Sequence, residues 1–331
     1  MSASPDTRMK LTREQKVEQA LFRAHGLTLM NPVYARAFLS IADSLLEADC
    51  APRDLTPEAL GLRDGRASAA ILAREAGVIA GLAEYAYIVT RSGAQVSVTA
   101  RDGQCVRSGE EVLTAAGSRS QLLSIERFGL NLLQRMSGIA TATRSLQERA
   151  RKRSSTARIV ATRKTPWGLL DKRAVHLGGG GTHRLGLWDA IVIKNNHLAL
   201  IANREEEAAP LAIQRAWNAR RESAFIEVEV RGPSAALAAA REFCRLQEQA
   251  SEDYPCLLML DNMTPQEIDQ VLEALRREHL WDHVLIEASG RVDETNIEQY
   301  AATGVDAISV GALTHSARAL DLSQRISLNH V

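Results

Sequence analysis

The sequence predicts an α/β protein in which a small mixed domain precedes a parallel α/β barrel. Residues 67–116 contain short β-prone runs separated by glycines, a pattern typical of hairpins in a small mixed sheet. After Arg158 the chain repeats a short apolar run, a polar motif and a helical stretch. Such alternation implies parallel strands joined by helices, and closure into a barrel would leave the sheet without an open edge.

The composition narrows the classes of partner. The 331 residues include 40 basic and 40 acidic side chains, so no overall field favours nucleic acid or an anionic membrane. No apolar run approaches the roughly 20 residues of a membrane-spanning helix, and the first residues lack the apolar segment of a signal peptide. We therefore expect a cytoplasmic protein without nucleic-acid or membrane partners. The cysteines lack the spacing of a zinc site or a disulfide framework and are expected to be reduced: Cys50, Cys105, Cys244 and Cys256.

The first part of the chain is expected to mix helices and short strands. Thr12 and Gln15 form a potential capping box before an apolar pattern that ends at Gly26, and a second helical pattern covers residues 34–46. The expected strands cover residues 69–72, 78–79, 95–99 and 111–114. A long helical pattern then covers residues 118–150.

Six apolar runs are expected to be the barrel strands. They are residues 159–161, 190–193, 225–230, 257–260, 284–286 and 307–310. One helix start between them is explicit, because Thr264 can act as N-cap, Pro265 occupies the first turn and Glu267 completes a capping box.

Polar residues follow the strand ends. They are Arg163-Lys164, Lys194, Glu229, Asp261, residues 287–289 and Gly311. Because the carboxyl ends of barrel strands carry the active site, these residues are the candidate site.

The segment 161–197 gathers cations and glycines. It contains Arg163, Lys164, His183, Arg184, Lys194 and the run Gly178–Gly181. Arginine and lysine bind carboxylate or phosphate, and glycines let backbone amides approach a ligand. A solvated basic loop is the alternative. The position of Lys164 and Lys194 just beyond apolar runs favours an anion site.

Two acids alternate within the run 225–230. Glu227 and Glu229 share one face of the expected strand and point into the barrel, where buried carboxylates need partners. The candidate partners are Lys164 and Lys194, or a divalent metal held together with Asp261. Simple pairing of both acids by those lysines inside the core is the alternative.

Two small-residue motifs are candidates for phosphate binding. Ser289-Gly290 and Gly311 each follow an expected strand and precede a helical stretch, where backbone amides favour phosphate. The last two strands are also the usual position of a phosphate site in α/β barrels.

Several long motifs resemble those of the quinolinate phosphoribosyltransferase family. They are ERFGLNLLQRMSGIAT (126–141), TRKT (162–165), GGGGTHRLGLWDAIVIKNNH (178–197), EVEV (227–230), LMLDNM (258–263), EASG (287–290) and TGVDAISVGALTHSARALD (303–321). The resemblance implies an N-terminal α/β sandwich domain over residues 1–126, onto which residues 317–331 pack back, and an incomplete α/β barrel over residues 127–316. It also implies a homodimer, or a higher oligomer of dimers, with shared active sites.

The resemblance further implies a reaction and its residues. Quinolinate and phosphoribosyl pyrophosphate would give nicotinate mononucleotide, pyrophosphate and CO2 in NAD biosynthesis. Lys164, Glu229 and Asp261 would be catalytic, with Mg²⁺ at Glu229 and Asp261. The substrate-binding residues would be Arg127 of the neighbouring subunit, Arg163, Lys164, His183, Arg184, Lys194, Glu229, Asp261, Ser289, Gly290, Arg291, Gly311 and His315.

Three departures from the family pattern concern substrate detail. The loop after Thr165 is about two residues shorter than usual, Asn195 replaces an acid, and Arg291 replaces a glycine. A phosphoribosyltransferase with another acceptor and a catalytically silent anion-binding paralogue are the alternative functions.

Overall fold

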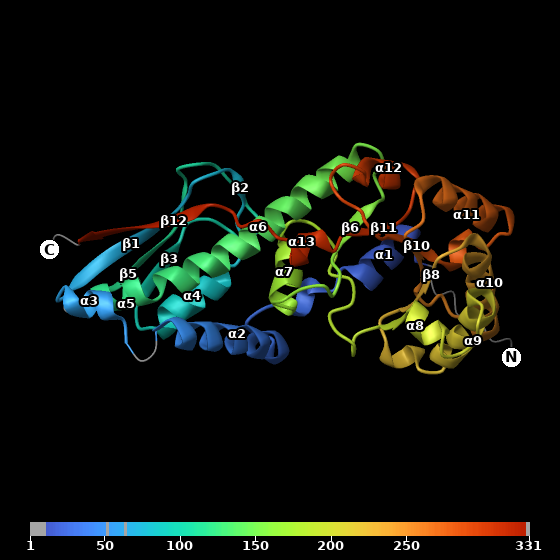
Figure 1. The fold of residues 1–331 in the computed structure, drawn as a ribbon, viewed down its shortest axis with the longest axis horizontal. Helices are drawn as coiled ribbons and strands as arrows, with labels where there is room; N and C mark the ends of the chain where they lie inside the picture. Colours follow the sequence, from blue (N-terminus) through green and yellow to red (C-terminus); the bar gives the residue numbers. More distant parts are fainter. Residues whose placement is uncertain (1–10, 51–52, 63–64, 329–331) are drawn as a thin grey trace, which may run out of the picture. The chain divides into compact units, whose positions relative to one another are not determined.

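The structure is a computed structural model that describes residues 11–50, 53–62 and 65–328. It contains two compact units that interleave along the chain (Figure 1). One unit comprises Met1–Arg23, Arg149–Val160 and His183–Val310, and the other comprises Ala24–Glu148, Ala161–Thr182 and Gly311–Val331. The division after residue 126 that the family resemblance implied stays a prediction.

The first unit is built on a six-stranded parallel sheet in the order β6-β11-β10-β9-β8-β7. All six predicted strands are present: β6 (Arg158–Val160), β7 (Ile191–Ile193), β8 (Ile226–Val230), β9 (Cys256–Asp261), β10 (Leu285–Ser289) and β11 (Ala307–Ser309). Within the described residues β6 and β7 do not pair with each other. The barrel is thus incomplete, as the family resemblance implied, and the closure expected from the strand pattern alone is wrong.

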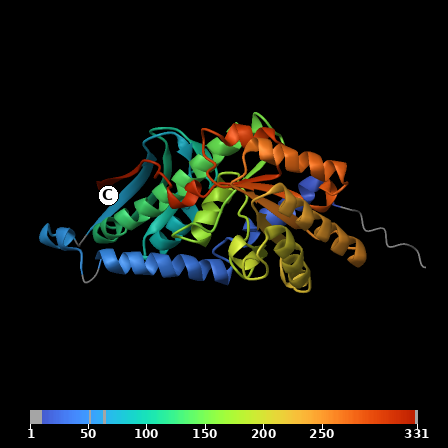
Figure 2. The same ribbon diagram turned by 45° about the vertical axis from the view of Figure 1, so that its right-hand side comes forward.

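Helices connect the parallel strands. They are α8 (Asn195–Leu198), α9 (Glu205–Trp217), α10 (Pro233–Ala250), α11 (Pro265–Arg277) and α12 (Ile297–Ala302), with 3-10 turns η2 (Arg220–Glu222) and η3 (Trp281–His283). The yellow-to-orange helices α9, α10 and α11 lie side by side along the sheet (Figure 2). The predicted capping box of α11 is confirmed, because the Thr264 and Glu267 side chains each bond the other's backbone amide.

Helix α1 (Arg13–Leu21) closes the amino end of this sheet. Its buried face, Val17, Ala20 and Leu21, belongs to one hydrophobic cluster with the first residues of several strands, among them Leu285 and Ala307. The predicted capping box of Thr12 and Gln15 is confirmed. A helix at this end leaves the carboxyl ends of the strands for polar side chains.

The second unit is built on a four-stranded antiparallel sheet in the order β12-β1-β5-β3. Its strands are β1 (Arg66–Ala73), β3 (Gln95–Val98), β5 (Glu111–Ser118) and β12 (Leu322–Leu328), and β2 (Gly77–Val78) pairs separately with β4 (Cys105–Val106). Strand β12 from the end of the chain lies antiparallel to β1 (red beside blue in Figure 1). The strand at 322–328 is an addition to the four that the sequence predicted.

Helices accompany the antiparallel sheet. They are η1 (Ala24–Gly26), α2 (Pro32–Cys50), α3 (Leu55–Ala59), α4 (Leu82–Arg91), α5 (Arg119–Ser124), α6 (Glu126–Arg151), α7 (Leu169–Leu177) and α13 (Ala312–His315). The helical pattern over 118–150 is divided, since α5 ends before Ile125 and α6 begins after it. In the described part of the chain no helix has the length and apolarity needed to cross a bilayer. Cys105, Cys244 and Cys256 are free thiols, and the side chain of Cys50 lies outside the described residues.

Candidate active site

The carboxyl ends of β7, β8 and β9 bring acids and cations together. Lys194 follows β7 directly, and its Nζ lies 3.3 Å from Oε2 of Glu229 on the neighbouring strand β8. Glu229 is only 7% exposed, whereas the Lys194 side chain is 48% exposed. Asp261 ends β9, and the Arg231 guanidinium lies 3.7 Å from its Oδ2. Each acid is thus matched by one cation that remains accessible to an anionic ligand.

The end of β10 provides a tight turn beside Asp261. Ser289 lies opposite Asp261 in the parallel register, and its carbonyl accepts a hydrogen bond from Asn262 N at 2.8 Å. Gly290 has φ +98°, and a Cβ there would meet the Asn262 side chain at 2.5 Å. Only glycine suits both the conformation and the space.

The turn at Gly290 does not lead directly into a helix. Helix α12 begins only at Ile297, so the backbone amides around Ser289 and Gly290 belong to a loop. The expectation of a helix start beside this motif is wrong. Arg291 continues the loop with φ +51° and is exposed.

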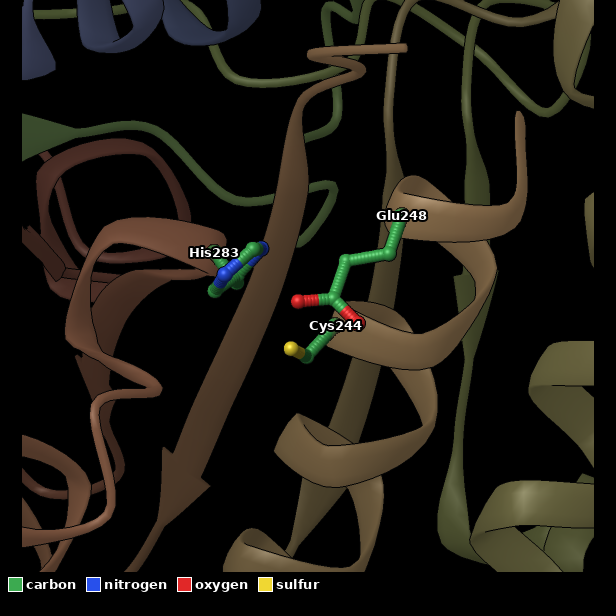
Figure 3. A group of neighbouring side chains, drawn as sticks. All are labelled: Cys244, Glu248 and His283. Atoms are coloured by element: carbon green, nitrogen blue, oxygen red, sulfur yellow. The ribbon is translucent and has the colours of Figure 1, made fainter. Parts of the chain in front are cut away.

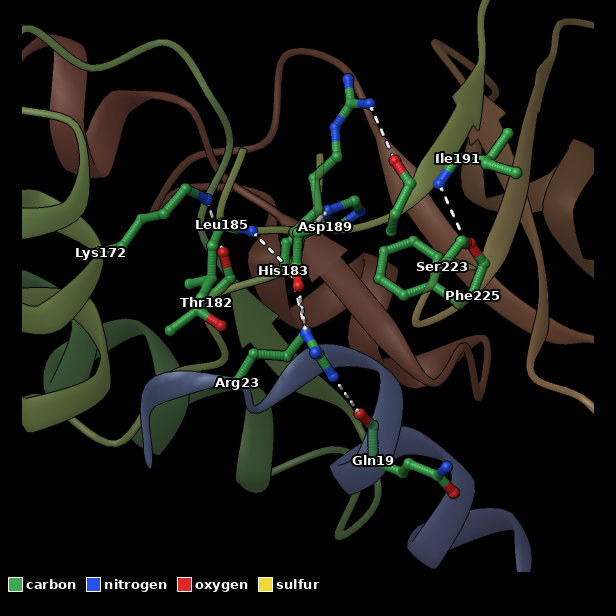
Figure 4. Close-up of polar contacts among 12 residues, drawn as sticks. Gln19, Arg23, Lys172, Thr182, His183, Leu185, Asp189, Ile191, Ser223 and Phe225 are labelled. Atoms are coloured by element: carbon green, nitrogen blue, oxygen red, sulfur yellow. Dashed lines mark hydrogen bonds and ion pairs between the residues drawn. The ribbon is translucent and has the colours of Figure 1, made fainter. Parts of the chain in front are cut away.

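The His183 ring lies between the carboxylates of Glu227 on β8 and Glu287 on β10. Its Nε2 is 3.1 Å from Glu227 Oε2 and 3.2 Å from Glu287 Oε2, and all three residues are buried. Its ring packs edge-on against Phe225, with centroids 5.3 Å apart (Figure 4). Glu227 is buried as expected, but its partner is His183 and not Lys164 or Lys194.

The cluster of His183, Glu227 and Glu287 retains protons. Burial alone would lower the pKa of His183, but the two carboxylates outweigh it and raise this pKa to about 9. Burial raises the pKa of Glu227, and the charge of Glu287 raises it further. His183 Nδ1 also accepts a hydrogen bond from Arg184 N at 2.8 Å, which favours keeping the proton on Nε2, between the carboxylates. The carboxylates of Glu227 and Glu287 thus hold a proton on His183 against the opposing effects of its burial and of the hydrogen bond that Nδ1 accepts.

Arg184 is held by the loop that leads into β7. The residue is 7% exposed, and Nη1 donates to the Ala190 carbonyl at 3.4 Å. Asp189 closes the same loop by accepting from Leu185 N at 2.8 Å and from Arg23 Nε at 2.9 Å (Figure 4). These hydrogen bonds hold both the Arg184 side chain and the loop that carries it in place.

The second unit brings Lys164, Gly311 and His315 together. Thr314 Oγ1 donates to the Lys164 carbonyl at 2.8 Å. A Cβ on Gly311 would lie 3.2 Å from Cδ2 of His315 and 3.3 Å from Cδ of Lys164. Glycine at 311 thus keeps the space between a lysine and a histidine open. Both of those side chains are exposed.

Two further predicted arginines of this unit are exposed. Arg163 precedes Lys164, and Arg127 lies in the first turn of α6. The loop after Thr165 is anchored at the buried carboxylate of Asp171, which accepts from Thr165 Oγ1 and, at 2.9 Å, from Arg135 Nε.

The glycine run 178–181 serves packing. A Cβ on Gly178 would lie 2.4 Å from the carbonyl oxygen of Ala140 in α6, and Gly179 has φ +92°. Gly178, Gly180 and Gly181 are buried. At Gly178 the absence of a side chain therefore allows two backbones to approach closely, and the expectation that the run presents amides to a ligand stays a prediction.

Comparison with known proteins assigns the family. The model of the quinolinate phosphoribosyl transferase N-terminal domain matches residues 54–137, and that of the C-terminal domain matches residues 139–325. The probable nicotinate-nucleotide pyrophosphorylase (carboxylating) of Methanothermobacter thermautotrophicus is 41% identical over 290 residues, which cover 87% of this chain and 98% of that relative. The nicotinate-nucleotide pyrophosphorylase (carboxylating) of Homo sapiens is 33% identical over 314 residues, 93% of this chain and 97% of that one.

A solved structure agrees with these relatives. The crystal structure of NadC from Streptococcus pyogenes has a TM-score of 0.74 and 32% sequence identity, and the match covers 87% of this chain and 95% of that chain. The matches in sequence span both of the family's domains, and the match in structure covers most of each chain. The chain belongs to the quinolinate phosphoribosyltransferase family.

Proposed function

We propose that the protein transfers the phosphoribosyl group of phosphoribosyl pyrophosphate to quinolinate and releases pyrophosphate and CO2, giving nicotinate mononucleotide for NAD biosynthesis. The observation that carries the proposal is the ion pair of Lys194 with Glu229 next to Asp261, at the carboxyl ends of adjacent strands. The relatives named above support the same reaction, because their names specify a carboxylating nicotinate-nucleotide pyrophosphorylase.

The substrate-binding part of the proposal rests on charge. Quinolinate carries two carboxylates, which Arg163, His183 and Arg184 would hold, with Arg127 supplied by a second subunit. The buried position of His183 favours a contribution through the Arg184 backbone that its Nδ1 binds.

A different set of residues would bind the phosphate groups of phosphoribosyl pyrophosphate. Lys164, Lys194 and His315 supply cations, and Ser289, Gly290, Arg291 and Gly311 line the proposed 5′-phosphate site.

Glu229 and Asp261 would act on the ribose. When the bond from the anomeric carbon to pyrophosphate breaks, the ribose becomes positively charged, and two nearby carboxylates stabilise that charge. The quinolinate ring nitrogen then bonds to the anomeric carbon. The resulting pyridinium accepts the electron pair that the 2-carboxylate leaves behind as CO2 departs, and a proton takes its place on the ring.

The donor set of Glu229 and Asp261 fits Mg²⁺. Both offer hard carboxylate oxygens on neighbouring strands, and Mg²⁺ is usually held by one or two carboxylates together with substrate phosphates. When bound, Mg²⁺ neutralises the diphosphate charge. Lys194 and Arg231, which pair with these acids, would be free to turn toward the phosphates.

The proposal includes a homodimer, or an oligomer of dimers, in the cytoplasm. Three described cysteines are free thiols, which suits a reducing compartment. Incubation with phosphoribosyl pyrophosphate and either quinolinate or nicotinate tests the reaction. Production of nicotinate mononucleotide and CO2 from quinolinate is expected. Turnover of nicotinate alone would indicate a related phosphoribosyltransferase, and turnover of neither substrate would indicate a silent anion-binding paralogue.

A further inference from the structure

Three side chains with different metal-binding atoms meet on the outside of the parallel-sheet unit. Cys244 and Glu248 lie one turn apart on α10, and His283 lies in η3, just before β10. The Cys244 sulfur, a Glu248 oxygen and a ring nitrogen of His283 all lie within 4.8 Å of one another (Figure 3). We propose that these residues form a binding site for Zn²⁺ that ties α10 to η3.

The hydrogen bonds of His283 prepare it as a ligand. Its Nδ1 lies 2.8 Å from Gln247 Oε1. The amide orientation of Gln247 is set by its own Nε2, which donates to the Tyr254 carbonyl at 2.9 Å and to the His283 carbonyl at 3.1 Å. Nδ1 must therefore carry the proton, and the imidazole lone pair is on Nε2. A hydrogen bond from the ring nitrogen that does not bind the metal, here Nδ1 of His283 to Gln247 Oε1, is the arrangement that orients metal-bound histidines.

The choice of Zn²⁺ follows from the donor atoms. A thiolate, an imidazole and a carboxylate suit Zn²⁺, whereas Mg²⁺ prefers oxygen ligands. Burial and the neighbouring Glu248 raise the pKa of the Cys244 thiol, so without a metal the thiol stays protonated. Binding replaces the thiol proton, which passes to solvent, by a sulfur–zinc bond. Three protein ligands leave the fourth position of a tetrahedral ion to water.

The site lies away from the proposed reaction. Helix α10 starts after the carboxyl end of β8 and returns to the amino end of the sheet, and Cys244 and Glu248 lie in its second half. His283 precedes β10 at the same end. Glu229 and Asp261 lie at the opposite ends of their strands. The metal would therefore take no part in the proposed reaction.

Cobalt substitution tests the site without any measurement of activity. The full chain, freed of metal by a chelator, is titrated with Co²⁺ while the near-ultraviolet absorption of a thiolate–cobalt bond is recorded. The chain is expected to bind one Co²⁺ with this band and to lose the band when Zn²⁺ is added. Cys244→Ser should abolish the band and weaken Zn²⁺ binding by more than about tenfold, since even residues that only orient ligands contribute roughly 10–100-fold.

The matched control is Cys105→Ser, which alters another free thiol and should leave the titration unchanged. Urea unfolding of metal-free Cys244→Ser establishes that the variant is folded. His283→Gln should weaken Zn²⁺ binding as Cys244→Ser does. A band that persists in Cys244→Ser, or a wild-type chain that shows none, would overturn the proposal. Neither result depends on whether quinolinate is turned over.

Discussion

Arg13 and Asp306 form a two-point ion pair that fastens α1 to the parallel sheet. Arg13 Nε lies 2.6 Å from Asp306 Oδ1, and Nη2 lies 2.6 Å from Oδ2. Asp306 is nearly buried and also accepts from Ile286 N at 2.7 Å. The Arg13 guanidinium stacks 3.5 Å above the centre of the Trp281 ring. The Asp306 carboxylate therefore accepts hydrogen bonds both from Arg13 of helix α1 and from a backbone amide of strand β10.

Asp306→Ala should lower the free energy of unfolding by about 3–5 kcal/mol, the usual effect of breaking a buried ion pair. The matched control is Glu298→Ala, which removes the partner of a 59%-exposed Arg153 side chain and should cost less than about 1 kcal/mol. Urea denaturation of both variants measures the difference. Equal losses would show that the Arg13 pair is no stronger than a surface pair.

The cluster of His183, Glu227 and Glu287 should make stability depend on pH. The pKa of His183 is raised from 6.5 to about 9, so its stabilisation is complete below pH 6.5 and is lost as the pH rises through about 9. The pKa of Glu227 is raised from 4.5, so the folded chain keeps a proton that the unfolded chain releases above that pH. Both shifts make stability fall from mildly acidic to alkaline pH, by up to about 1.4 kcal/mol per pH unit for each extra proton.

Glu287→Gln provides the test of this pH dependence. Loss of one carboxylate should bring the pKa values of His183 and Glu227 closer to their ordinary values. The urea midpoint, measured between about pH 6 and pH 9, should then fall less steeply in Glu287→Gln than in the wild type. Parallel curves would mean that other groups determine the pH dependence.

The local signals in the sequence predicted the elements well. Both capping boxes, at Thr12 and at Thr264, form as expected, because each depends on residues three positions apart. The six parallel strands were also evident, since fully buried strands appear as continuous apolar runs. The polar residues after these runs indicated the edge of the sheet at which Lys194, Glu229 and Asp261 lie.

Partners that are distant in the sequence were not predictable in this way. His183 contacts Glu227 and Glu287, but nothing near His183 in the sequence specifies strands β8 and β10. Arg231 follows β8 directly and lies beside Asp261, and its position after the EVEV motif was the one signal that could have identified it. The role of Gly178 depends on its approach to Ala140, which only the folded chain reveals.

Glu229→Gln and Asp261→Asn should each lower turnover by about 100-fold, a loss of roughly 2.7 kcal/mol of transition-state stabilisation, with a smaller change in quinolinate affinity. Glu229 and Asp261 close adjacent strands, where we place the ribose and Mg²⁺. Steady-state kinetics at saturating Mg²⁺, with circular dichroism to verify folding, measure the effect. Glu206→Gln on α9 is the control, because this acid is in a surface pair with Arg204. Wild-type turnover in both site variants would remove these acids from the mechanism.

Arg127 should act in the active site of a second subunit. It is exposed in the first turn of α6, and no described residue forms an ion pair with it. The neighbouring Glu126 carboxylate instead accepts a hydrogen bond from Gln324 Nε2 at 3.1 Å. An unpaired arginine on the surface suits contact with the substrate of a partner chain in a two-fold dimer, in which each subunit serves the other.

Mixing two inactive variants tests this arrangement. If Arg127 acts in trans, a mixed dimer of Arg127→Ala and Lys164→Ala subunits has one site with both defects and one site with neither. Random pairing of equal amounts should then restore activity to about a quarter of the wild type, because half of the dimers are mixed and each has one intact site. Mass spectrometry verifies that mixed dimers have formed. Mixed dimers without activity would place Arg127 in the site of its own subunit, and a fully active Arg127→Ala enzyme would remove it from the site, because a surface arginine contributes less than about 1 kcal/mol through ion pairing alone.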